Sequence, residues 1–378
     1  MWTLAAAGAV EEDAAPVMDD DAGNFYPRWS EDGKTLYFSS DRGGPTNLWR
    51  VAIDPRTGLA TGEPEPMTVP AGDARNTSFS RQETRLAFEA WSFRTRLRQA
   101  AFDASRGLLA GSPREFWSVS RRLEAPRLSP DGEWVVVTRW AGGGSNEDLL
   151  VVKTDGSGYR QLTDDESRDR SPRFSPDGQR VAFYSSRNGS PAQIYEVHTD
   201  GSGLRRFENP EGRSLYYPLY APDASRLAAA DEVGGTWLLD LENPSAGWTS
   251  LHRPVSGEPL GDTVSSWSAD GKRIAGDSID KSFRRLGIYV ESIETGERRR
   301  LTTTGGSPRW LSDSRRILYL DSGTIRLLDS VTGQGPQVHA EPAPWQLWGF
   351  DLAQDERTLL LLEVAFESDI WVMSEDSK

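Results

Sequence analysis

Four arginines follow a proline in a phrase that recurs along the chain: Arg28, Arg127, Arg173 and Arg309. A guanidinium group carries a rigid fork of donors that matches a carboxylate or a phosphate. If the four side chains converged, they would form a cationic ring in a chain of formal charge −14. Such a ring suits a carboxylate, a phosphate or a peptide C terminus. The favoured alternative is that each arginine pairs with an acidic neighbour, for example Asp169 or Glu124.

Two tyrosines stand directly before prolines of the same phrase. Tyr26 precedes Pro27, and Tyr217 precedes Pro218. Tyrosine and arginine together are typical of interface hot spots, and they are equally typical of packing between neighbouring elements. Tyr26 and Tyr217 are therefore predicted to serve either a binding surface or packing.

Groups that could catalyse a reaction are scarce. The chain has no cysteine, and its three histidines, His198, His252 and His339, lack the H-x-x-x-H or H-x-E spacing of zinc sites. Residues 305–309 (GGSPR) approach the nucleophile-elbow pattern G-x-S-x-G but end in arginine. The sequence therefore leans against an enzyme and predicts no catalytic residue and no metal ligand.

Two acidic runs, residues 19–21 (DDD) and 164–166 (DDE), occupy the same place in two copies of the repeat. Their carboxylates could coordinate Ca²⁺, but neither run has the spacing of an EF-hand loop. A solvated loop is the favoured interpretation. The prediction is that the chain uses no cofactor, with Ca²⁺ at these loops as the lesser alternative.

The recurring phrase is Pro-x-aromatic-Ser-x-Asp-Gly followed by a run typical of a β-strand, and eight copies can be placed. Their Asp positions, with Gln82 and seven aspartates, fall at 32, 82, 131, 177, 223, 270, 313 and 355, so the period is 42–50 residues. Four short strands with their connections need about 40–50 residues, which is one propeller blade. The sequence predicts an all-β, eight-bladed β-propeller of four-stranded antiparallel blades, with seven blades as the alternative.

The Asp-Gly pairs are assigned to turns. An aspartate at such a position bonds to its own backbone, and glycine supplies the positive φ of a tight hairpin. The predicted structural turn residues are Asp32, Gly33, Asp131, Gly132, Asp177, Gly178, Asp270 and Gly271.

The chain ends predict how the ring closes. The eighth copy has three expected strands before the chain stops, and residues 17–29 align without a gap with residues 162–174, which run from an outer strand into an inner one. Residues 10–19 are therefore expected to complete the last blade, since closure removes exposed sheet edges. Residues 1–9 are assigned to a leader or boundary segment, and residues 10–378 to a single propeller. Its blades are expected to start near residues 26, 76, 124, 171, 217, 265, 307 and 348.

Three phrases resemble the WD40-like (PD40) repeats of TolB-like propellers: SPDG-x-x-VAF at 175–183, DGSG at 155–158 and 200–203, and NLWRV at 47–51. Such repeats occur in periplasmic TolB, in tricorn-like and prolyl-oligopeptidase-like peptidases, and in sensor halves of bacterial membrane kinases and winged-helix regulators. TolB itself is similar only at the level of the repeat, because its propeller has six blades and it carries an additional α/β domain.

The expected function is a non-enzymatic binding or sensor propeller that holds a peptide, a protein partner or a small anionic ligand at the channel mouth. The alternative is the propeller module of a TolB-, tricorn- or prolyl-oligopeptidase-like hydrolase whose catalytic domain is absent from this chain. The excess of 57 Asp and Glu over 43 Lys and Arg disfavours nucleic acid. No apolar run is long enough for membrane insertion. The resemblance implies an extracytoplasmic protein, periplasmic or secreted, or such a domain of a membrane-anchored protein. A monomer is expected.

Overall fold

The computed structural model describes residues 2–3, 15–18, 22–40, 42, 46–68, 73–80, 85–140, 147–187, 189, 191–209, 212–252, 262–280 and 284–374. These residues form strands, turns and one short 3₁₀ helix, Pro244–Ala246. Among them, no helix has the length and apolar character needed to cross a membrane. The described part of the chain is built from β-strands, as predicted for an all-β protein.

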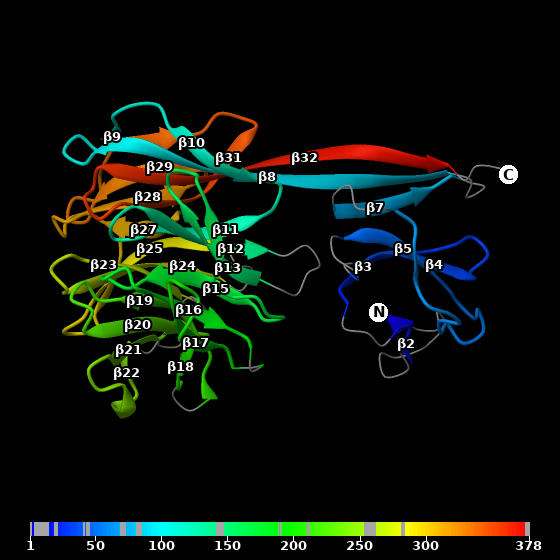
Figure 1. The fold of residues 1–378 in the computed structure, drawn as a ribbon, viewed down its shortest axis with the longest axis horizontal. Coiled ribbons are helices and arrows are strands. Elements are labelled where there is room, and N and C mark those ends of the chain that lie inside the picture. Colours follow the sequence, from blue (N-terminus) through cyan, green and yellow to red (C-terminus); the bar gives the residue numbers. More distant parts are fainter. Residues whose placement is uncertain are drawn as a thin grey trace. The chain divides into compact units, whose positions relative to one another are not determined.

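The chain divides into two compact units (Figure 1), whereas the sequence predicted a single propeller over residues 10–378. We call them unit 1 and unit 2. Unit 1 comprises Met1–Arg94, Trp140–Asn146 and Phe366–Lys378. Unit 2 comprises Thr95–Arg139 and Glu147–Ala365.

The fourth repeat shows how a blade of unit 2 is built. Its strands are paired in chain order and are antiparallel: β15 (Asp169–Phe174), β16 (Arg180–Ser185), β17 (Gln193–His198) and β18 (Arg205–Phe207). Alternate side chains of β16, Val181 and Phe183, are fully buried with Leu149 and Val151 of the preceding blade. Because alternate residues of a strand face opposite sides of its sheet, each blade packs its neighbours on both faces.

Four further sheets of unit 2 repeat this arrangement. The third repeat forms β11 (Leu123–Leu128), β12 (Trp134–Trp140), β13 (Glu147–Lys153) and β14 (Tyr159–Gln161). The fifth forms β19 (Leu215–Tyr220), β20 (Arg226–Asp231), β21 (Thr236–Asp240) and β22 (Trp248–His252). The sixth forms β23 (Asp262–Trp267), β24 (Arg273–Ile279), β25 (Arg285–Ser292) and β26 (Arg298–Arg300). The seventh forms β27 (Gly306–Trp310), β28 (Arg316–Asp321), β29 (Thr324–Asp329) and β30 (Gln337–Ala340).

The last blade of unit 2 combines two repeats that lie far apart in sequence. Its sheet order is β31-β32-β8-β10. The eighth repeat supplies β31 (Trp345–Leu352) and β32 (Thr358–Ser374), and the second supplies β8 (Arg85–Asp103) and β10 (Arg114–Val119). The short β9 (Leu108–Leu109) pairs with the end of β8.

This blade corrects the prediction that residues 10–19 complete the last blade. Its outer positions are taken by β8 and β10, because β8 runs on without a turn and carries its second half into this sheet. The described part of the N-terminal segment, β2 (Ala15–Pro16), pairs instead with β1 (Trp2–Thr3).

The innermost strands of unit 2 form a closed ring. In ring order they are β31, β11, β15, β19, β23 and β27, each in contact with the next and β27 in contact with β31. Among the described residues, unit 2 therefore closes on itself with six blades, and neither eight nor seven blades are present in this ring. The repeat period indicated the blade correctly, but it did not indicate which repeats share a ring.

Unit 1 holds the first repeat and part of the second. Its complete sheet consists of β3 (Asn24–Trp29), β4 (Thr35–Ser40), β5 (Asn47–Ala52) and β6 (Glu65–Pro66). A core of Leu36, Phe38, Val51 and Ile53 with Val17 stabilises it. β7 (Asp73–Phe79) pairs with the first half of β8.

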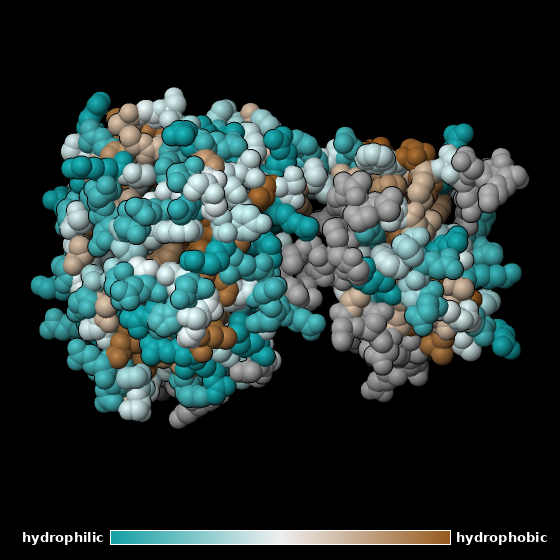
Figure 2. Space-filling model, viewed as in Figure 1, coloured by the Kyte–Doolittle hydropathy of each residue, from teal (hydrophilic) through white to brown (hydrophobic). Residues whose placement is uncertain are grey.

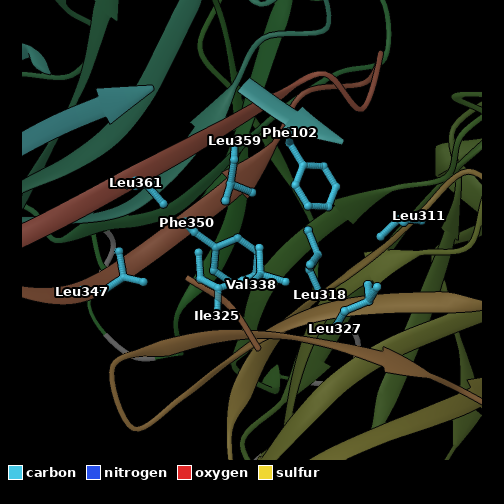
Figure 3. Packing of buried hydrophobic residues seen from close by; sticks show 10 residues of the cluster. All are labelled: Phe102, Leu311, Leu318, Ile325, Leu327, Val338, Leu347, Phe350, Leu359 and Leu361. Atoms are coloured by element: carbon cyan, nitrogen blue, oxygen red, sulfur yellow. The ribbon is translucent and has the colours of Figure 1, made fainter. Parts of the chain in front are cut away.

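A buried cluster in unit 2 joins the mixed last blade to the seventh repeat (Figure 3). Phe102 of β8 packs with Phe350 of β31 and Leu361 of β32, and Leu318 and Ile325 of the neighbouring blade complete the contact. Burying a side chain of this size stabilises a fold by about 1.5–3 kcal/mol. The cluster therefore anchors the second half of β8 in unit 2. Most of the visible surface of unit 2 is hydrophilic (Figure 2).

Candidate functional site

An irregularity in the inner strands sets the direction of the arginines. In β11, β15 and β27 the register shifts just before the arginine. The residue before each proline has a positive φ: 50° at Ala125, 52° at Ser171 and 55° at Ser307. Left-handed backbone costs a non-glycine residue about 1–2 kcal/mol. Because the geometry recurs even at an alanine, it belongs to the repeat and is imposed by the blade.

The register identifies one equivalent position on each inner strand of unit 2. In each blade, the residue at this position pairs with the equivalent residue of the second strand. The six residues, in ring order from β31, are Asp351, Arg127, Arg173, Leu219, Ser266 and Arg309. The ring therefore carries three arginines and one carboxylate at one level.

Arg309 is the best anchored of the three arginines. Its Nε donates to Asp351 Oδ1 at 2.7 Å, and its Nη1 donates to the carbonyl oxygens of Ser265 and Pro308 at 2.7 and 2.8 Å. The second oxygen of Asp351 accepts a bond of 2.9 Å from the backbone N–H of Leu128. Both oxygens of the carboxylate are thus engaged inside the ring.

Arg173 and Arg127 converge on the same place. Arg173 Nη2 donates to the Ser265 carbonyl oxygen at 3.4 Å, the same atom that Arg309 contacts. Arg127 donates through Nη1 to the carbonyl oxygen of Pro126. Burial and the neighbouring charge of Arg309 hold the pKa of Arg127 well below its usual value, although Asp351 opposes that effect.

Each of the three guanidinium groups retains a buried nitrogen with no hydrogen-bond partner among the described residues. These atoms are Arg127 Nε, Arg173 Nη1 and Arg309 Nη2. Arg173 and Arg309 are 8% and 7% exposed. A buried donor left without a partner costs about 1–3 kcal/mol, and more when it is charged. An anion placed among these groups would satisfy donors that the chain itself leaves unmatched.

The structure brings together three of the four predicted arginines. Arg28 lies in unit 1, is exposed, and donates Nε to the carbonyl oxygen of Thr77 at 3.3 Å. Tyr26 also lies in unit 1 and is 46% exposed. Tyr217 lies in unit 2, where its ring meets Tyr184 edge-on at 5.7 Å, and burial raises its pKa.

The two suggested acidic partners of the arginines are engaged elsewhere. Asp169 Oδ2 accepts a bond of 2.6 Å from Arg187, and Glu124 pairs with Arg122. Asp351 was missed because its strand, WQLWGFDL, lacks the proline that marked the other copies. Alignment of the eighth copy on Leu352 would have placed Asp351 at the arginine position.

The structure describes the acidic run at residues 164–166 and the predicted turns, but not the run at residues 19–21, which lies outside the described residues. Asp164 accepts a bond of 3.2 Å from Gln161, and Asp165 pairs with Arg187 at 3.2 Å. In the turns, Ser30 donates to Asp32 at 2.7 Å, and the same carboxylate accepts the backbone N–H of Lys34 at 3.0 Å.

The other predicted turns have the same geometry. The serine of each donates to the aspartate two residues later, at Ser129–Asp131, Ser175–Asp177 and Ser268–Asp270. The four following glycines, Gly33, Gly132, Gly178 and Gly271, have φ values of 69–72°. The hydrogen bonds of these aspartates are those of a turn.

A second polar cluster in unit 2 resembles a metal site in composition. Single ligand atoms of His339, Glu341 and Glu363 lie within 4.8 Å of one another. However, Arg96 and Arg98 both contact the two glutamates, with Nη2 of Arg96 and Nη1 of Arg98 at 2.7 and 2.8 Å from Glu341 Oε1. Since two guanidinium groups already neutralise the carboxylates, this donor set does not fit a cation.

The closed ring of four-stranded sheets and its convergent arginines define a β-propeller with a candidate anion site. Comparison with protein families gives a more specific result: residues 78–251 match the TolB β-propeller domain, PD40. The resemblance to TolB-like repeats is thereby confirmed.

Two curated relatives of this chain are named as peptidases. The chain is 38% identical over 98 residues to dipeptidyl-peptidase 5 of Porphyromonas gingivalis, covering 24% of this chain and 14% of the relative. It is 26% identical over 176 residues to the uncharacterized peptidase YuxL of Bacillus subtilis, covering 45% and 24%. The matched segments thus span a quarter or less of the relatives' lengths.

Solved structures support the fold. A putative TolB from Agrobacterium tumefaciens superimposes with a TM-score of 0.54 at 16% identity, covering 73% of this chain and 99% of that one. A chain of a nidogen/laminin complex gives 0.50 at 12% identity, covering 71% and 98%. At these identities the likeness shows a propeller fold alone.

Proposed function

We propose that unit 2 is a non-enzymatic binding or sensor propeller that holds an anionic group in its ring on Arg127, Arg173 and Arg309. The observation that carries the proposal is the set of three buried guanidinium nitrogens that have no hydrogen-bond partner among the described residues, on the arginines that share the ring with the carboxylate of Asp351. Charge-assisted hydrogen bonds are shorter and about twice as strong as neutral ones. A carboxylate therefore gains more here than any neutral ligand.

The anion we propose is the carboxylate of a peptide C terminus or of an acidic side chain of a protein partner, with a small free anion as the simpler form of the same chemistry. A rigid ring on which several strands converge suits such a ligand, because the cost of ordering the site is already met by the fold. Arg309 is held by the carboxylate of Asp351, whereas the printed bonds of Arg173 and Arg127 go to neutral carbonyl oxygens, so we assign the main ligand contacts to Arg173 and Arg127.

The relationship to peptidases supports a second proposal, that this propeller works beside a hydrolase domain. Two curated relatives that match part of the chain are named as peptidases. In that setting the arginines would recognise the carboxylate of a peptide substrate. Both proposals assign the same chemistry to the ring.

The proposals on cellular setting rest on the resemblance to TolB-like propellers. We propose a bacterial, extracytoplasmic protein, periplasmic or secreted, or such a domain of a membrane-anchored one, because TolB-like propellers provide the resemblance. We propose a monomer with a protein or peptide partner. We also propose that no cofactor is required.

Calorimetric titration of the whole chain tests the anion site. The probes are acetate, inorganic phosphate, and one short peptide prepared with a free and with an amidated C terminus. Loss of one charge-assisted bond costs about 1.5–3 kcal/mol, so Arg173→Gln should weaken binding of the free-carboxyl peptide about 10- to 100-fold. Arg28→Gln is the matched control, because Arg28 has the same place in the repeat but lies in unit 1.

The amidated peptide separates carboxylate recognition from other contacts. Weaker binding of the amidated form, together with an effect of Arg173→Gln and none of Arg28→Gln, supports the site. Equal binding of both peptides to folded wild-type protein and to Arg173→Gln would exclude it. Binding of phosphate alone would favour a small anion over a peptide.

A further inference from the structure

Two repeats differ from all the others in the connection between their second and third strands. In the fourth and fifth repeats, for example, these strands are separate elements, β16 and β17 or β20 and β21. In the second and eighth repeats, the second and third strands are continuous and form one long strand each. β8 has 19 residues and β32 has 17. Ordinary strands have about 5–6 residues. Each long strand therefore contains two strands of its repeat without the turn between them.

The two long strands have exchanged their ends. The boundary between the units falls at Arg94/Thr95 in β8 and at Ala365/Phe366 in β32. The second half of β8 joins the first half of β32 in the last blade of unit 2. The outer half of the second repeat therefore lies in unit 2, with the inner half of the eighth repeat. The outer half of the eighth repeat lies in unit 1, with the inner half of the second repeat.

Contacts in unit 1 show the reverse exchange. The ring of Phe366 in β32 meets the rings of Trp91 and Phe93 in β8 edge-on, at 6.5 and 5.2 Å. Glu367 pairs with Arg94 at 3.6 Å. The end of β32 therefore packs on the inner half of the second repeat and not on its own.

The exchange in unit 2 is held by the cluster of Arg96, Arg98, Glu341 and Glu363. Arg96 Nε contacts Glu363 Oε2 at 2.5 Å, and Arg98 Nη1 contacts Glu363 Oε1 at 3.3 Å. Glu363 is completely buried. These ion pairs exist only while the second half of β8 lies beside β32.

Three aromatic residues on the inner strand of the first repeat are exposed. Phe25, Tyr26 and Trp29 of β3 are 46–47% exposed. The equivalent aromatic residues of inner strands in unit 2, Trp310 and Tyr220, are each 7% exposed because a neighbouring blade covers them. β3 therefore has the sequence of a ring strand without the burial of one.

We propose that the chain has a second closure, in which β8 and β32 each fold back as a hairpin and all eight repeats form one ring. The outer half of the second repeat would pair with the first half of β8, beside β7. The outer half of the eighth repeat would pair with the first half of β32, beside β31. The surface of β3 is the docking face for this closure, and its partner is the inner strands of the same chain.

Both closures pair a second strand with a third strand, within one repeat in the proposed closure and between the second and eighth repeats in the present one. An exchange of equivalent elements preserves the type of strand pairing and changes the hinges, as in domain swapping, although the side chains that meet differ. Folds with two packings of one sequence differ by only a few kcal/mol. The closure with six blades gains the ion pairs of Glu363, and the closure with eight repeats gains the burial of β3.

Spin-label distances in the cysteine-free chain test this inference directly. Glu115→Cys on β10 and Gln354→Cys in the turn before β32 place both labels in one sheet of the present structure. Strands in a sheet are about 4.8 Å apart, so the wild-type background should give a short distance, on the order of 20 Å. In the eight-repeat ring the first repeat would separate the labelled repeats, and the distance would lengthen.

Hairpin-forming substitutions should shift the equilibrium. Asn-Gly is the strongest two-residue hairpin signal, so the variant with Ser92→Asn, Phe93→Gly, Glu367→Asn and Ser368→Gly should populate the long distance. Glu363→Gln should do so to a smaller extent. A label pair at Glu133→Cys and Gln179→Cys, in neighbouring blades under either closure, should keep its distance and report that the fold is intact.

Three outcomes decide the matter. A long distance in a monomeric hairpin variant, with the control pair unchanged, supports the second closure. A short distance in the same folded variant would overturn it. A long distance confined to a dimeric fraction would also overturn it, because the exchange would then occur between two copies.

Discussion

The same three residues occur in both units with opposite surroundings. Pro27-Arg28-Trp29 lies on β3 of unit 1, and Pro308-Arg309-Trp310 lies on β27 of unit 2. Trp29 is 47% exposed and Trp310 is 7% exposed. Among the described residues, Arg28 makes one bond, of 3.3 Å, to a carbonyl oxygen, whereas Arg309 makes three bonds of 2.7–2.8 Å and keeps one buried donor that has no partner there.

The difference separates what the phrase encodes from what the ring adds. Both strands have the same local backbone, with φ of 53° at Tyr26 and 55° at Ser307 and a register shift before the arginine. Burial and ion pairing differ because they depend on the neighbouring blade. The phrase therefore specifies an inner strand, and the closure of the ring makes it a candidate site.

The largest expected difference between the units is in the loss of stability when Trp310 or Trp29 is replaced by alanine. Removing a buried large aromatic side chain costs about 3–5 kcal/mol, so Trp310→Ala should lower the free energy of unfolding of unit 2 by that amount. Trp29→Ala should change stability by about 0.5 kcal/mol or less, as exposed positions do. Urea unfolding followed by circular dichroism measures both. Equal losses would show that Trp29 is covered in solution.

The charged pair gives a smaller contrast. Breaking a buried pair costs about 3–5 kcal/mol, but the loss of Arg309 also relieves its repulsion of Arg127. Arg309→Gln should therefore cost about 2 kcal/mol, and Arg28→Gln much less. Asp351→Asn should cost more than Arg309→Gln, because the three guanidinium groups would then lose the carboxylate that bonds Arg309 within the ring. The opposite order in urea unfolding would mean that the arginines do not share one site.

The sequence predicted the blades but not which repeats close into one ring. The period, the Asp-Gly turns and the Pro-Arg phrase are local, so they predicted strand order within repeats and the positions of Arg127, Arg173 and Arg309. The turn between the two halves of β8 was expected from the repeat, and only packing such as that of Phe102 with Phe350 and Leu361 determines that the strand continues. Asp351 required a spatial alignment, because it replaces an arginine in a copy without proline.

The turns should show no contrast between the units. Ser30 and Ser175 have the same role: each Oγ accepts a backbone N–H, from Thr35 at 2.9 Å and from Arg180 at 3.0 Å. Loss of such a bond costs about 1 kcal/mol, so Ser30→Ala and Ser175→Ala should destabilise their units by similar amounts. Urea unfolding monitored in each unit provides the measurement. A cost in unit 2 alone would mean that these turns depend on the ring.

The smallest expected effect is in the ionisation of the turn aspartates. The backbone N–H of Lys34 and the hydroxyl of Ser30 lower the pKa of Asp32, and the hydroxyl of Ser175 and the backbone N–H of Gln179 lower that of Asp177. Both folded-state values lie below 3.8. The stabilisation is therefore complete above pH 3.8 and is lost as the pH falls through the lowered pKa values. Carboxyl-carbon NMR titration should show both aspartates titrating below 3.8, with Ser30→Ala and Ser175→Ala each moving its own aspartate upward. A shift in one unit only would contradict a purely local origin, because the donors of each carboxylate come from its own turn.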